Sequence, residues 1–278
     1  MKRLLTLLFA TSAFAADTIR TEHDVDYLGV GRKEKADLYL PANPQPGQRF
    51  PAVVIIHGGG WSGGEKRAAR EINIGTTLAL NGYVGMSIDY VLANNDHPGP
   101  TWPQNLHDCK TAVRWLRANA ERLNVDPAHI GVIGGSAGGH LAAMVGLCGG
   151  ELDPPGEGNA RVQCAVDLYG PVLCFETRDI SMFRKTRVEA PELYKQADPR
   201  SHIDKNDPPL LILHGTADKT VAVADSEALA AAMKAVGATY QLEIIPDAPH
   251  TFHLQPKQRD LRPLVLGFFD KHLKPKAR

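Results

Sequence analysis

The sequence has 278 residues with 31 basic and 31 acidic side chains, so its formal net charge is zero, and 43% of its residues are hydrophobic. This is the composition of an ordinary globular protein that is long enough for one sizeable core. The balanced charge offers no basic field for a polyanion, which argues against a protein that binds nucleic acid.

The first fifteen residues have the pattern of a secretory signal peptide. MKRLLTLLFATSAFA places Lys2 and Arg3 before a short apolar stretch, which ends in the cleavage-site motif AFA. The stretch is too short to span a bilayer, and no second run of spanning length follows it. A buried first helix is the alternative. We expect residues 1–15 to be a signal peptide and the protein to be secreted or periplasmic, with no membrane partner.

Edge strands and then a buried strand are predicted next. Residues 19–41 alternate apolar and polar side chains, which predicts an antiparallel ribbon on the edge of a sheet. PAVVIIHG at 51–58 is a continuous apolar run rich in β-branched residues, which is typical of a buried parallel strand.

The motif HGGGW, His57–Trp61, follows this strand directly. Its glycines let the backbone fold back so that N–H groups face an oxyanion, which predicts an oxyanion hole that includes the amides of Gly59 and Gly60. The stretch GGGWSG also satisfies the dinucleotide-binding pattern G-x-G-x-x-G, but Trp61 inside the turn and the missing acid about twenty residues on argue against that function. His57 is interpreted as a structural hydrogen-bonding residue at the end of the strand, and a general base is the alternative.

Strands and helices alternate over the remainder of the chain. Further strands are predicted at 83–90, 130–135, 162–170, 209–215 and 240–246, and helices at 65–81, 104–124, 137–147, 224–237 and 259–273. This alternation predicts an α/β fold with a mostly parallel sheet and helices on both faces. Residues 171–208 interrupt it, and we interpret them as a lid-like insertion in a single catalytic domain, 16–278.

Ser136 lies in the middle of IGVIGGSAGGHLA, residues 130–142. Gly134–Gly138 reads G-x-S-x-G where the strand passes into a helix, and a sharp turn of this kind exposes the serine hydroxyl and requires small neighbours. The helix that follows directs its amides and positive dipole end at the reacting centre. A glycine-rich turn with an N-cap serine is the alternative. We interpret Ser136 as a nucleophile and add the amide of Ala137 to the oxyanion hole.

A serine nucleophile needs a base, and the base needs an acid to orient it. In doubly wound hydrolases the chain order is nucleophile, acid, histidine. PPLLILHGTADKTV places Asp218 just after a strand, and EIIPDAPHTFHL places His250 just after the next. The alternatives are Asp225 or Asp247 for the acid and His253, His214 or His272 for the base.

The histidine and cysteine spacings offer little support for a metal site or for a particular disulfide pairing. His250 and His253 have a faint zinc-ligand spacing without a third ligand in view. Four cysteines allow two disulfides in three connectivities, but free cysteines are also common in cores, and the sequence does not choose between these arrangements. They are Cys109, Cys148, Cys164 and Cys174.

Five motifs match a known family in order, over roughly residues 50–270: HGGGW, SIDYVL, DCKTAVRWLRANAERLNVDPAHIGVIGGSAGGHLAA, PPLLILHGTADKTV and PHTFHL. On these motifs the chain resembles the α/β-hydrolases, close to the hormone-sensitive-lipase-like esterases and the bacterial carbohydrate esterases that include acetyl xylan and feruloyl esterases. The resemblance implies an α/β-hydrolase sheet of about eight strands, and neither a metal nor a cofactor. It implies the catalytic triad Ser136, Asp218 and His250, with Gly59, Gly60 and Ala137 around the oxyanion.

The chain departs from this family in two places. The family motif is commonly D-Y-R-L, whereas this chain has Asp89-Tyr90-Val91-Leu92 and so loses an arginine that is expected to tether a neighbouring loop. The long N-terminal lid helices of the lipase-like branch are replaced by short strands, which favours an open-sited esterase.

The substrate is predicted less directly. Trp61, Trp102 and Phe252 near the strand ends are candidate substrate-binding residues. The resemblance suggests removal of acetyl or feruloyl groups from plant polysaccharide. A broad carboxylesterase for small esters is the alternative. An arylformamidase-like amidase and a non-catalytic binding module are less favoured, the latter because the whole triad is present.

Overall fold

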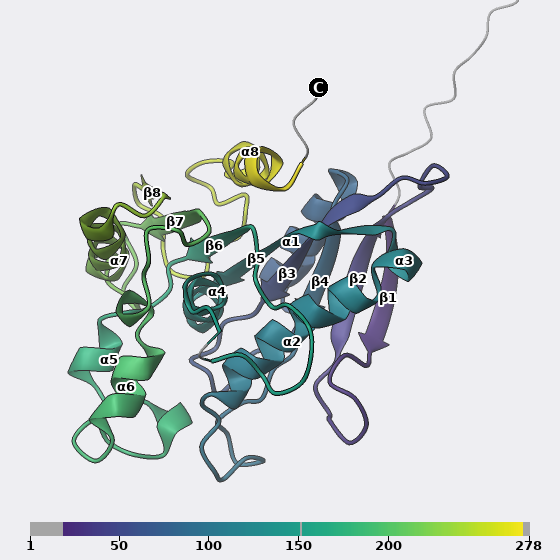
Figure 1. Cartoon of the computed structure of the whole chain (residues 1–278). Helices are drawn as coiled ribbons and strands as arrows, with labels where there is room; N and C mark the ends of the chain where they lie inside the picture. The colour runs from purple at the N-terminus through teal and green to yellow at the C-terminus, as the bar shows by residue number, and fades with distance from the viewer. Residues whose placement is uncertain (1–18, 151, 275–278) are drawn as a thin grey trace, which may run out of the picture.

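A computed structural model describes residues 19–150 and 152–274 (Figure 1). Its eight-stranded sheet has the order β1-β2-β4-β3-β5-β6-β7-β8. The strands are β1 Ile19–Val25, β2 Ala36–Pro41, β3 Phe50–Ile56, β4 Val84–Ile88, β5 Val125–Gly135, β6 Cys164–Leu168, β7 Leu210–Gly215 and β8 Tyr240–Ile245. β2 pairs antiparallel with β1 and β4, and the other neighbours are parallel. The predicted α/β fold is confirmed, whereas the predicted signal peptide lies outside the described residues.

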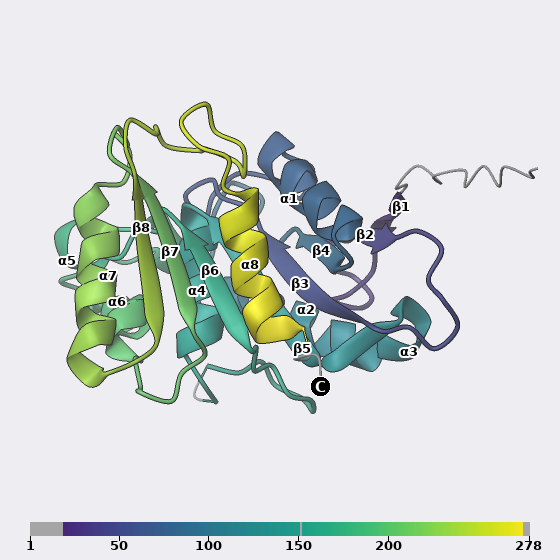
Figure 2. The same cartoon turned by 90° about the horizontal axis from the view of Figure 1, so that it is seen from above.

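Helices cover both faces of this sheet. The main helices are α1 Ala69–Leu80, α2 Gln104–Ala118, α3 Ala120–Leu123, α4 Ala137–Leu147, α7 Val223–Val236 and α8 Arg262–Leu273. In Figure 2, α8 crosses in front of the sheet, and α2 and α4 lie behind it. The helix expected at 104–124 is divided into α2 and α3 at Asn119. The side-chain Nδ2 of Asn119 donates to the Trp115 carbonyl and helps to end α2.

Strand β3 shows why its sequence is apolar without alternation. Val53 and Ile55 pack with side chains of α1 and α8. Val54 and Ile56 point to the opposite face and pack on the side of the sheet that α2 and α4 cover. All four are fully buried. Because a strand alternates its side chains between faces, a strand covered by helices on both sides must be apolar at every position.

Residues 171–208 form short helical pieces that pack against the main core. These are α5 Cys174–Thr177, the 3₁₀ helix Ser181–Phe183, α6 Pro191–Ala197 and the 3₁₀ helix Pro199–Ser201. Met182, Phe183 and Tyr194 are buried in the same apolar cluster as α2 and α4. The segment therefore has its own anchors in the core, and its role as a lid stays a prediction.

Cys109, Cys164 and Cys174 are buried free thiols. Burial raises the pKa of the Cys174 thiol to about 12, so this thiol stays protonated at neutral pH. Because all three thiols are free, no disulfide joins these three residues, and they act as small apolar side chains of the core.

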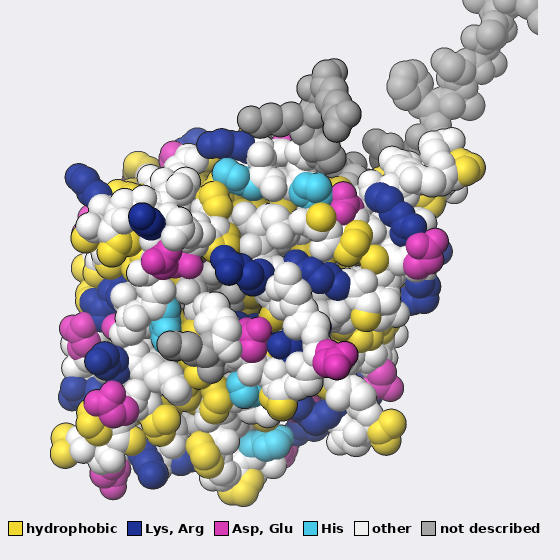
Figure 3. Space-filling model, in the orientation of Figure 1, with side chains coloured by type: hydrophobic (Ala, Val, Ile, Leu, Met, Phe, Trp, Pro, Cys, Tyr) yellow, Lys and Arg dark blue, Asp and Glu magenta, His cyan; other side chains and the backbone are white. Residues whose placement is uncertain are grey.

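The surface in Figure 3 intersperses basic, acidic and apolar side chains, in keeping with the balanced charge of the sequence. Within the described ranges, no helix combines the length and the apolar character needed to cross a membrane.

An ion pair joins the β1–β2 connection to α2 beside Val91. The Arg32 guanidinium donates two hydrogen bonds, of 3.1 and 2.7 Å, to the Asp108 carboxylate. Asp108 is fully buried and also accepts the N–H of Val91 at 2.9 Å. Arg32 therefore places a guanidinium near Val91, the position at which the family that this chain resembles commonly carries an arginine.

Replacing Arg32 by methionine is expected to lower the free energy of unfolding by about 2–4 kcal/mol, because the buried carboxylate of Asp108 loses its partner. Lys33 is a matched control, since it pairs with Asp96 where the two side chains are 60% and 68% exposed. Lys33→Met should change the unfolding free energy by less than about 0.5 kcal/mol. Urea unfolding measures both variants, and equal losses would contradict a special role for the Arg32 pair.

Candidate active site

Ser136 lies in a tight turn between β5 and α4. Its φ of 58° and ψ of −125° form a conformation that costs a residue other than glycine about 1–3 kcal/mol. A Cβ on Gly134 would lie 2.1 Å from the Gly138 carbonyl oxygen, and a Cβ on Gly138 would lie 2.1 Å from that of Ile56. The Ser136 N–H donates to the Leu168 carbonyl at 2.9 Å. Glycine is thus required on both sides of a serine that the sheet holds in place.

Loops after β7 and β8 bring an acid and a histidine to this serine. Nε2 of His250 lies 3.0 Å from Oγ of Ser136, and Nδ1 of His250 lies 2.6 Å from Oδ2 of Asp218. The Asp218 side chain is fully buried, and its Oδ1 accepts the N–H groups of Thr220 and Val221 at 2.8 and 2.9 Å. The structure therefore joins the three residues of the predicted triad by hydrogen bonds.

The charge of Asp218 determines which nitrogen of His250 carries the proton. Burial alone would raise the pKa of Asp218, but the hydrogen bond from His250 and those from the Val221 and Thr220 amides outweigh it and hold the pKa below its usual range. The ionised Asp218 accepts a hydrogen bond from Nδ1–H of His250, which keeps the proton on Nδ1 and leaves Nε2 as the acceptor that faces Ser136.

The loop after β3 lines the same pocket as Ser136. Gly59 and Gly60 have φ values of 117° and 61°, and a Cβ on Gly59 would lie 2.1 Å from the Gly63 carbonyl oxygen. Among the described residues, the amides of Gly59, Gly60 and Ala137 donate to no other backbone carbonyl. They are therefore free to donate to an oxyanion that forms at Ser136.

His57 supports this loop from inside the protein. Its Nδ1 lies 2.7 Å from the Gly58 carbonyl oxygen, and its ring stacks on Tyr90 with 4.3 Å between centroids. The Tyr90 hydroxyl donates to the His57 carbonyl at 3.1 Å. Burial lowers the pKa of His57 to about 4, so the ring is neutral at pH 7. These contacts agree with the structural role expected for His57.

A pocket of about 490 Å³ lies beside Ser136. Its walls are the glycine loop 58–60, the first turn of α1, Thr220 and the segment that carries His250. Its lining includes no residue of 171–208. The walls of this pocket therefore do not depend on the insertion.

The three aromatic residues expected to contact substrate are packed inside the protein instead. Trp61, Trp102 and Phe252 are only 3%, 5% and 5% exposed. Trp61 donates from Nε1 to Nδ1 of His140 at 3.1 Å, and Trp102 packs on the same imidazole. Phe252 packs edge-on against Tyr169. The expectation is corrected, because a ring with almost no exposed surface cannot stack on a substrate, and the pattern of apolar residues did not reveal this burial.

The alternative acids and bases have other partners. Oδ1 of Asp225 accepts the N–H groups of Val172 and Leu173, both at 2.8 Å. His214 is fully buried, with its Nδ1 2.7 Å from Oγ of Ser226 and its Nε2 3.3 Å from Oδ2 of Asp218, so it contacts the acid of the triad but not Ser136. In the described part of the chain, no hydrogen bond joins Ser136 to Asp247, His253 or His272. Nor does any group of three or more His, Cys, Asp or Glu side chains lie in position to hold a metal ion there.

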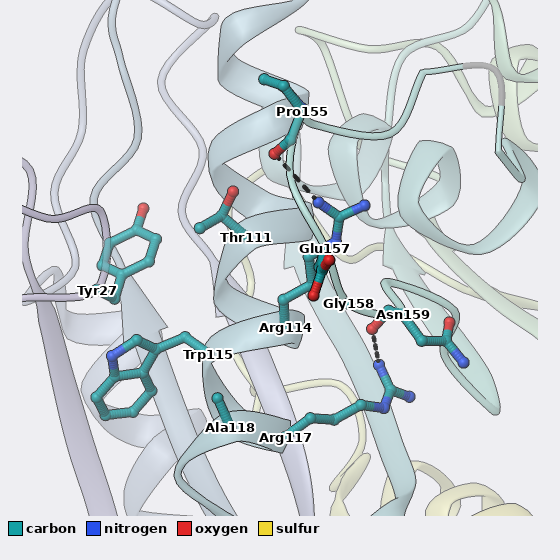
Figure 4. A pocket seen from close by; sticks show the side chains of 10 residues that line it. All are labelled: Tyr27, Thr111, Arg114, Trp115, Arg117, Ala118, Pro155, Glu157, Gly158 and Asn159. Atoms are coloured by element: carbon teal, nitrogen blue, oxygen red, sulfur yellow. Dashed lines mark hydrogen bonds between the residues drawn. The ribbon is translucent and has the colours of Figure 1, made fainter.

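A second pocket, of about 500 Å³, lies along α2, away from Ser136 (Figure 4). Tyr27 and Trp115 lie on one side of it and Arg117 on the other. The guanidiniums of Arg114 and Arg117 donate to the carbonyls of Pro154 and Asn159, at 2.7 and 2.6 Å. The lining contains no histidine, serine or cysteine, so it lacks the side chains of the predicted reaction.

Comparison with known proteins identifies the family. The family model of BD-FAE matches residues 36–233. The chain belongs to the BD-FAE family. Among curated relatives of this BD-FAE protein, Esterase LipQ of Mycobacterium tuberculosis is 32% identical over 83% of the chain and 57% of the relative. The chain spans just over half the length of the curated relatives it matches first, at 57%, 55% and 55%.

Solved structures of two related esterases cover almost the whole chain. A truncated carbohydrate esterase from gut microbiota aligns with a TM-score of 0.82 and 26% identity, over 94% of this chain and 99% of that one. Esterase 2 of Thermogutta terrifontis, solved with propionate bound, aligns with a TM-score of 0.75 and 28% identity, over 95% and 97% of the two chains. The α/β-hydrolase fold expected from the motifs is thus shown for this BD-FAE chain.

Sequence reasoning missed three buried side chains beside the triad. Arg70 and Tyr169 are hydrogen bonded to each other at 3.0 Å, and Nε2 of His140 lies 2.7 Å from the Ala197 carbonyl oxygen. A signal existed for Arg70, since the position before Ser136 is glycine although the motif leaves it open. Tyr169 and His140 gave no signal, because their partners come from distant segments.

Acidification is expected to destabilise the protein through its buried histidines. Burial lowers the pKa of His140, like that of His57, to about 4. The unfolded chain takes up protons at these residues below about pH 6.5, whereas the folded protein does so only below about pH 4. The unfolded state therefore binds more protons in this window, and the free energy of unfolding falls as the pH falls, by up to about 3 kcal/mol for each histidine.

Urea unfolding between pH 7 and pH 5 measures this loss. The variant His140→Gln cannot titrate at this position, so its unfolding free energy should depend less steeply on pH than that of the wild type. Identical slopes for the two proteins would contradict the neutral, buried state of His140.

Proposed function

We propose that this protein is an exported serine esterase that removes acetyl or feruloyl groups from plant cell-wall polysaccharide. The proposal rests on one observation, the hydrogen-bonded line from Oγ of Ser136 through His250 to Oδ2 of Asp218, at 3.0 and 2.6 Å. This line presents an activated hydroxyl beside free backbone amides, which is the arrangement that acyl transfer requires.

In the first half of the reaction, Nε2 of His250 takes the proton of Ser136 while Oγ attacks the ester carbonyl carbon. The carbonyl oxygen becomes an oxyanion and accepts hydrogen bonds from the amides of Gly59, Gly60 and Ala137. Asp218 stabilises the imidazolium of His250 without taking its proton. The carbon–oxygen bond to the alcohol then breaks, and His250 gives its proton to the departing alcohol.

In the second half, a water molecule attacks the acyl group on Ser136. His250 takes a proton from this water, and the same amides hold the second oxyanion. Collapse of that intermediate returns the proton from His250 to Oγ and releases the carboxylic acid. The enzyme is restored, and the net reaction is ester plus water to acid plus alcohol.

The choice of substrate rests on the pocket and on the solved relatives. A pocket of about 490 Å³ beside Ser136, whose lining includes no part of the insertion, suits an ester on a bulky alcohol. One related structure is a carbohydrate esterase from gut microbiota, and another was solved with the short acid propionate. The proposed export rests on the sequence of residues 1–15.

Replacing Ser136 by alanine is expected to lower kcat by at least about 10⁴-fold, because the acyl-enzyme cannot form. The matched pair His250→Gln and His253→Gln tests the base, since of these two histidines His250 is the one hydrogen bonded to Oγ of Ser136. His250→Gln should lose activity to a similar degree, and His253→Gln should keep the wild-type kcat. Steady-state hydrolysis of p-nitrophenyl acetate gives kcat for all three variants. A Ser136→Ala rate within tenfold of wild type would falsify the assignment of Ser136 as the nucleophile.

A substrate panel tests the natural ester. We expect fast acetate release from acetylated xylan or fast hydrolysis of methyl ferulate, with p-nitrophenyl octanoate turned over far more slowly than the acetate and butyrate. Turnover of the p-nitrophenyl esters alone would replace the polysaccharide proposal by a broad carboxylesterase. Hydrolysis of an aryl formamide in preference to every ester would favour the amidase.

A further inference from the structure

A largely buried guanidinium packs against the turn that carries Ser136. Arg70 lies in the first turn of α1, its side chain is 12% exposed, and it lines the pocket beside Ser136. A Cβ on Gly135 would lie 2.5 Å from Nη1 of Arg70, and a Cβ on Gly58 would lie 3.2 Å from Nη2. The guanidinium therefore occupies the space of a side chain at Gly135. This explains the glycine at a position that the G-x-S-x-G motif leaves open.

The same guanidinium reaches the segment of His250 through one tyrosine. Nη1 of Arg70 donates to the Tyr169 hydroxyl at 3.0 Å, and this hydroxyl donates to the Phe252 carbonyl at 2.7 Å. The rings of Tyr169 and His250 are 4.8 Å apart. Since Phe252 follows His250 by two residues, a fixed Phe252 carbonyl limits where the imidazole can lie.

Two neighbours of Arg70 on α1 complete the arrangement. Oε1 of Glu71 accepts Nε–H of Arg70 at 2.8 Å, and the Glu71 side chain is 1% exposed. Oδ1 of Asn73 accepts the N–H of Leu254 at 3.3 Å. Residues three apart share a helix face, so Arg70 and Asn73 present one face of α1 to the segment after His250.

We propose that Arg70 and Tyr169 are positioning residues that hold His250 at hydrogen-bond distance from Ser136, an inference that rests on the proposed esterase activity. Residues 246–261, which include His250, form neither helix nor strand. Backbone hydrogen bonds hold its two ends, from Ala217 N–H to the Ala248 carbonyl and from Leu261 N–H to the Leu254 carbonyl, so side-chain contacts must fix the residues between them, which include His250. The line from Arg70 through Tyr169 to the Phe252 carbonyl ties it to the same helix that packs against Gly135.

Arg70 acts by geometry rather than by net charge. Its guanidinium is paired with the buried carboxylate of Glu71, so the two charges offset each other. A fork of donors in a fixed plane can contact Glu71 and Tyr169 at once, which a lysine ammonium cannot do with the same geometry. The arrangement fixes the distance between Ser136 and His250, and proton transfer depends on that distance.

The test removes one hydroxyl and keeps the ring. Tyr169→Phe should lower kcat for p-nitrophenyl acetate about 10- to 100-fold, counted per active site titrated by its acylation burst, with KM within about twofold. Arg70→Met should cause a similar loss. The double variant should lose little more than the more affected single variant, because both act through one line of hydrogen bonds. Additive losses would contradict that line.

Tyr83→Phe is the matched control. Tyr83 is also fully buried, and its hydroxyl bonds to Asp270 of α8 at 2.6 Å. Both Tyr→Phe variants should lose similar thermal stability, but Tyr83→Phe should keep the wild-type kcat per titrated site. Equal kcat values in the two variants would overturn the inference, since Tyr169 would then be no more than a core residue.

A second measurement does not depend on turnover. The Nδ1–H proton of His250, which is hydrogen bonded to Asp218, is expected to give a low-field proton NMR resonance, and its loss in His250→Gln would assign it. Tyr169→Phe should shift or broaden this resonance, and Tyr83→Phe should leave it in place. An unchanged resonance in Tyr169→Phe overturns the inference even if the wild type hydrolyses no ester. Absence of Ser136-dependent hydrolysis in the wild type overturns the proposed function alone.

Discussion

The backbone conformation of Ser136 is the constraint on which the rest of the site depends. At a φ of 58° the chain turns so sharply that Gly134 and Gly138 have no room for a Cβ. The conformation costs about 1–3 kcal/mol and persists only where the surroundings fix it. Here Gly138 lies against the Ile56 carbonyl at the end of β3, and the Ser136 N–H is bonded to the last residue of β6. The sheet thus fixes the serine, and the other groups must be brought to it.

The strand order sets the difficulty of bringing His250 to that serine. Three strand spacings separate β8 from β5, and at about 4.8 Å each they amount to roughly 14 Å. Asp218 follows β7, which lies between β5 and β8 in the sheet. Its carboxylate can therefore bond to Nδ1 of His250, the ring nitrogen that does not face Ser136. Tyr169 follows β6, the remaining strand between β5 and β8, and its ring contacts that of His250 with 4.8 Å between centroids. The irregular segment after β8 spans this distance, and residues that follow the two intervening strands, Asp218 and Tyr169, hold it in place.

The same geometry explains what the sequence could and could not predict. Ser136, Asp218 and His250 each follow a predicted parallel strand, and because such strands end at one edge of a sheet, chain order alone was enough to bring them together. The fold followed from the apolar runs for a similar reason. Trp61 and Trp102 are buried by contacts with His140 and α6, which lie far from them in the sequence. A local sequence pattern therefore could not show whether these side chains belong to the core or line the pocket. Arg32 was missed because it lies in a loop, and the carboxylate that it binds, Asp108, is contributed by a distant helix.

The polar groups around the serine are arranged so that few charges compete with the reaction. His57 and His140 are kept neutral by burial, and Arg70 is offset by Glu71. Asp218 is the ionised group in contact with His250, and its charge favours the imidazolium that forms when Ser136 is deprotonated. In the proposed reaction, the developing oxyanion would meet the dipoles of fixed amides rather than a mobile cation, and these dipoles need no reorganisation because the loops already hold them. Backbone strain at Ser136 is therefore the cost of an electrostatic environment that is set before the substrate arrives, whereas Gly59 and Gly60 adopt their positive φ values without such strain.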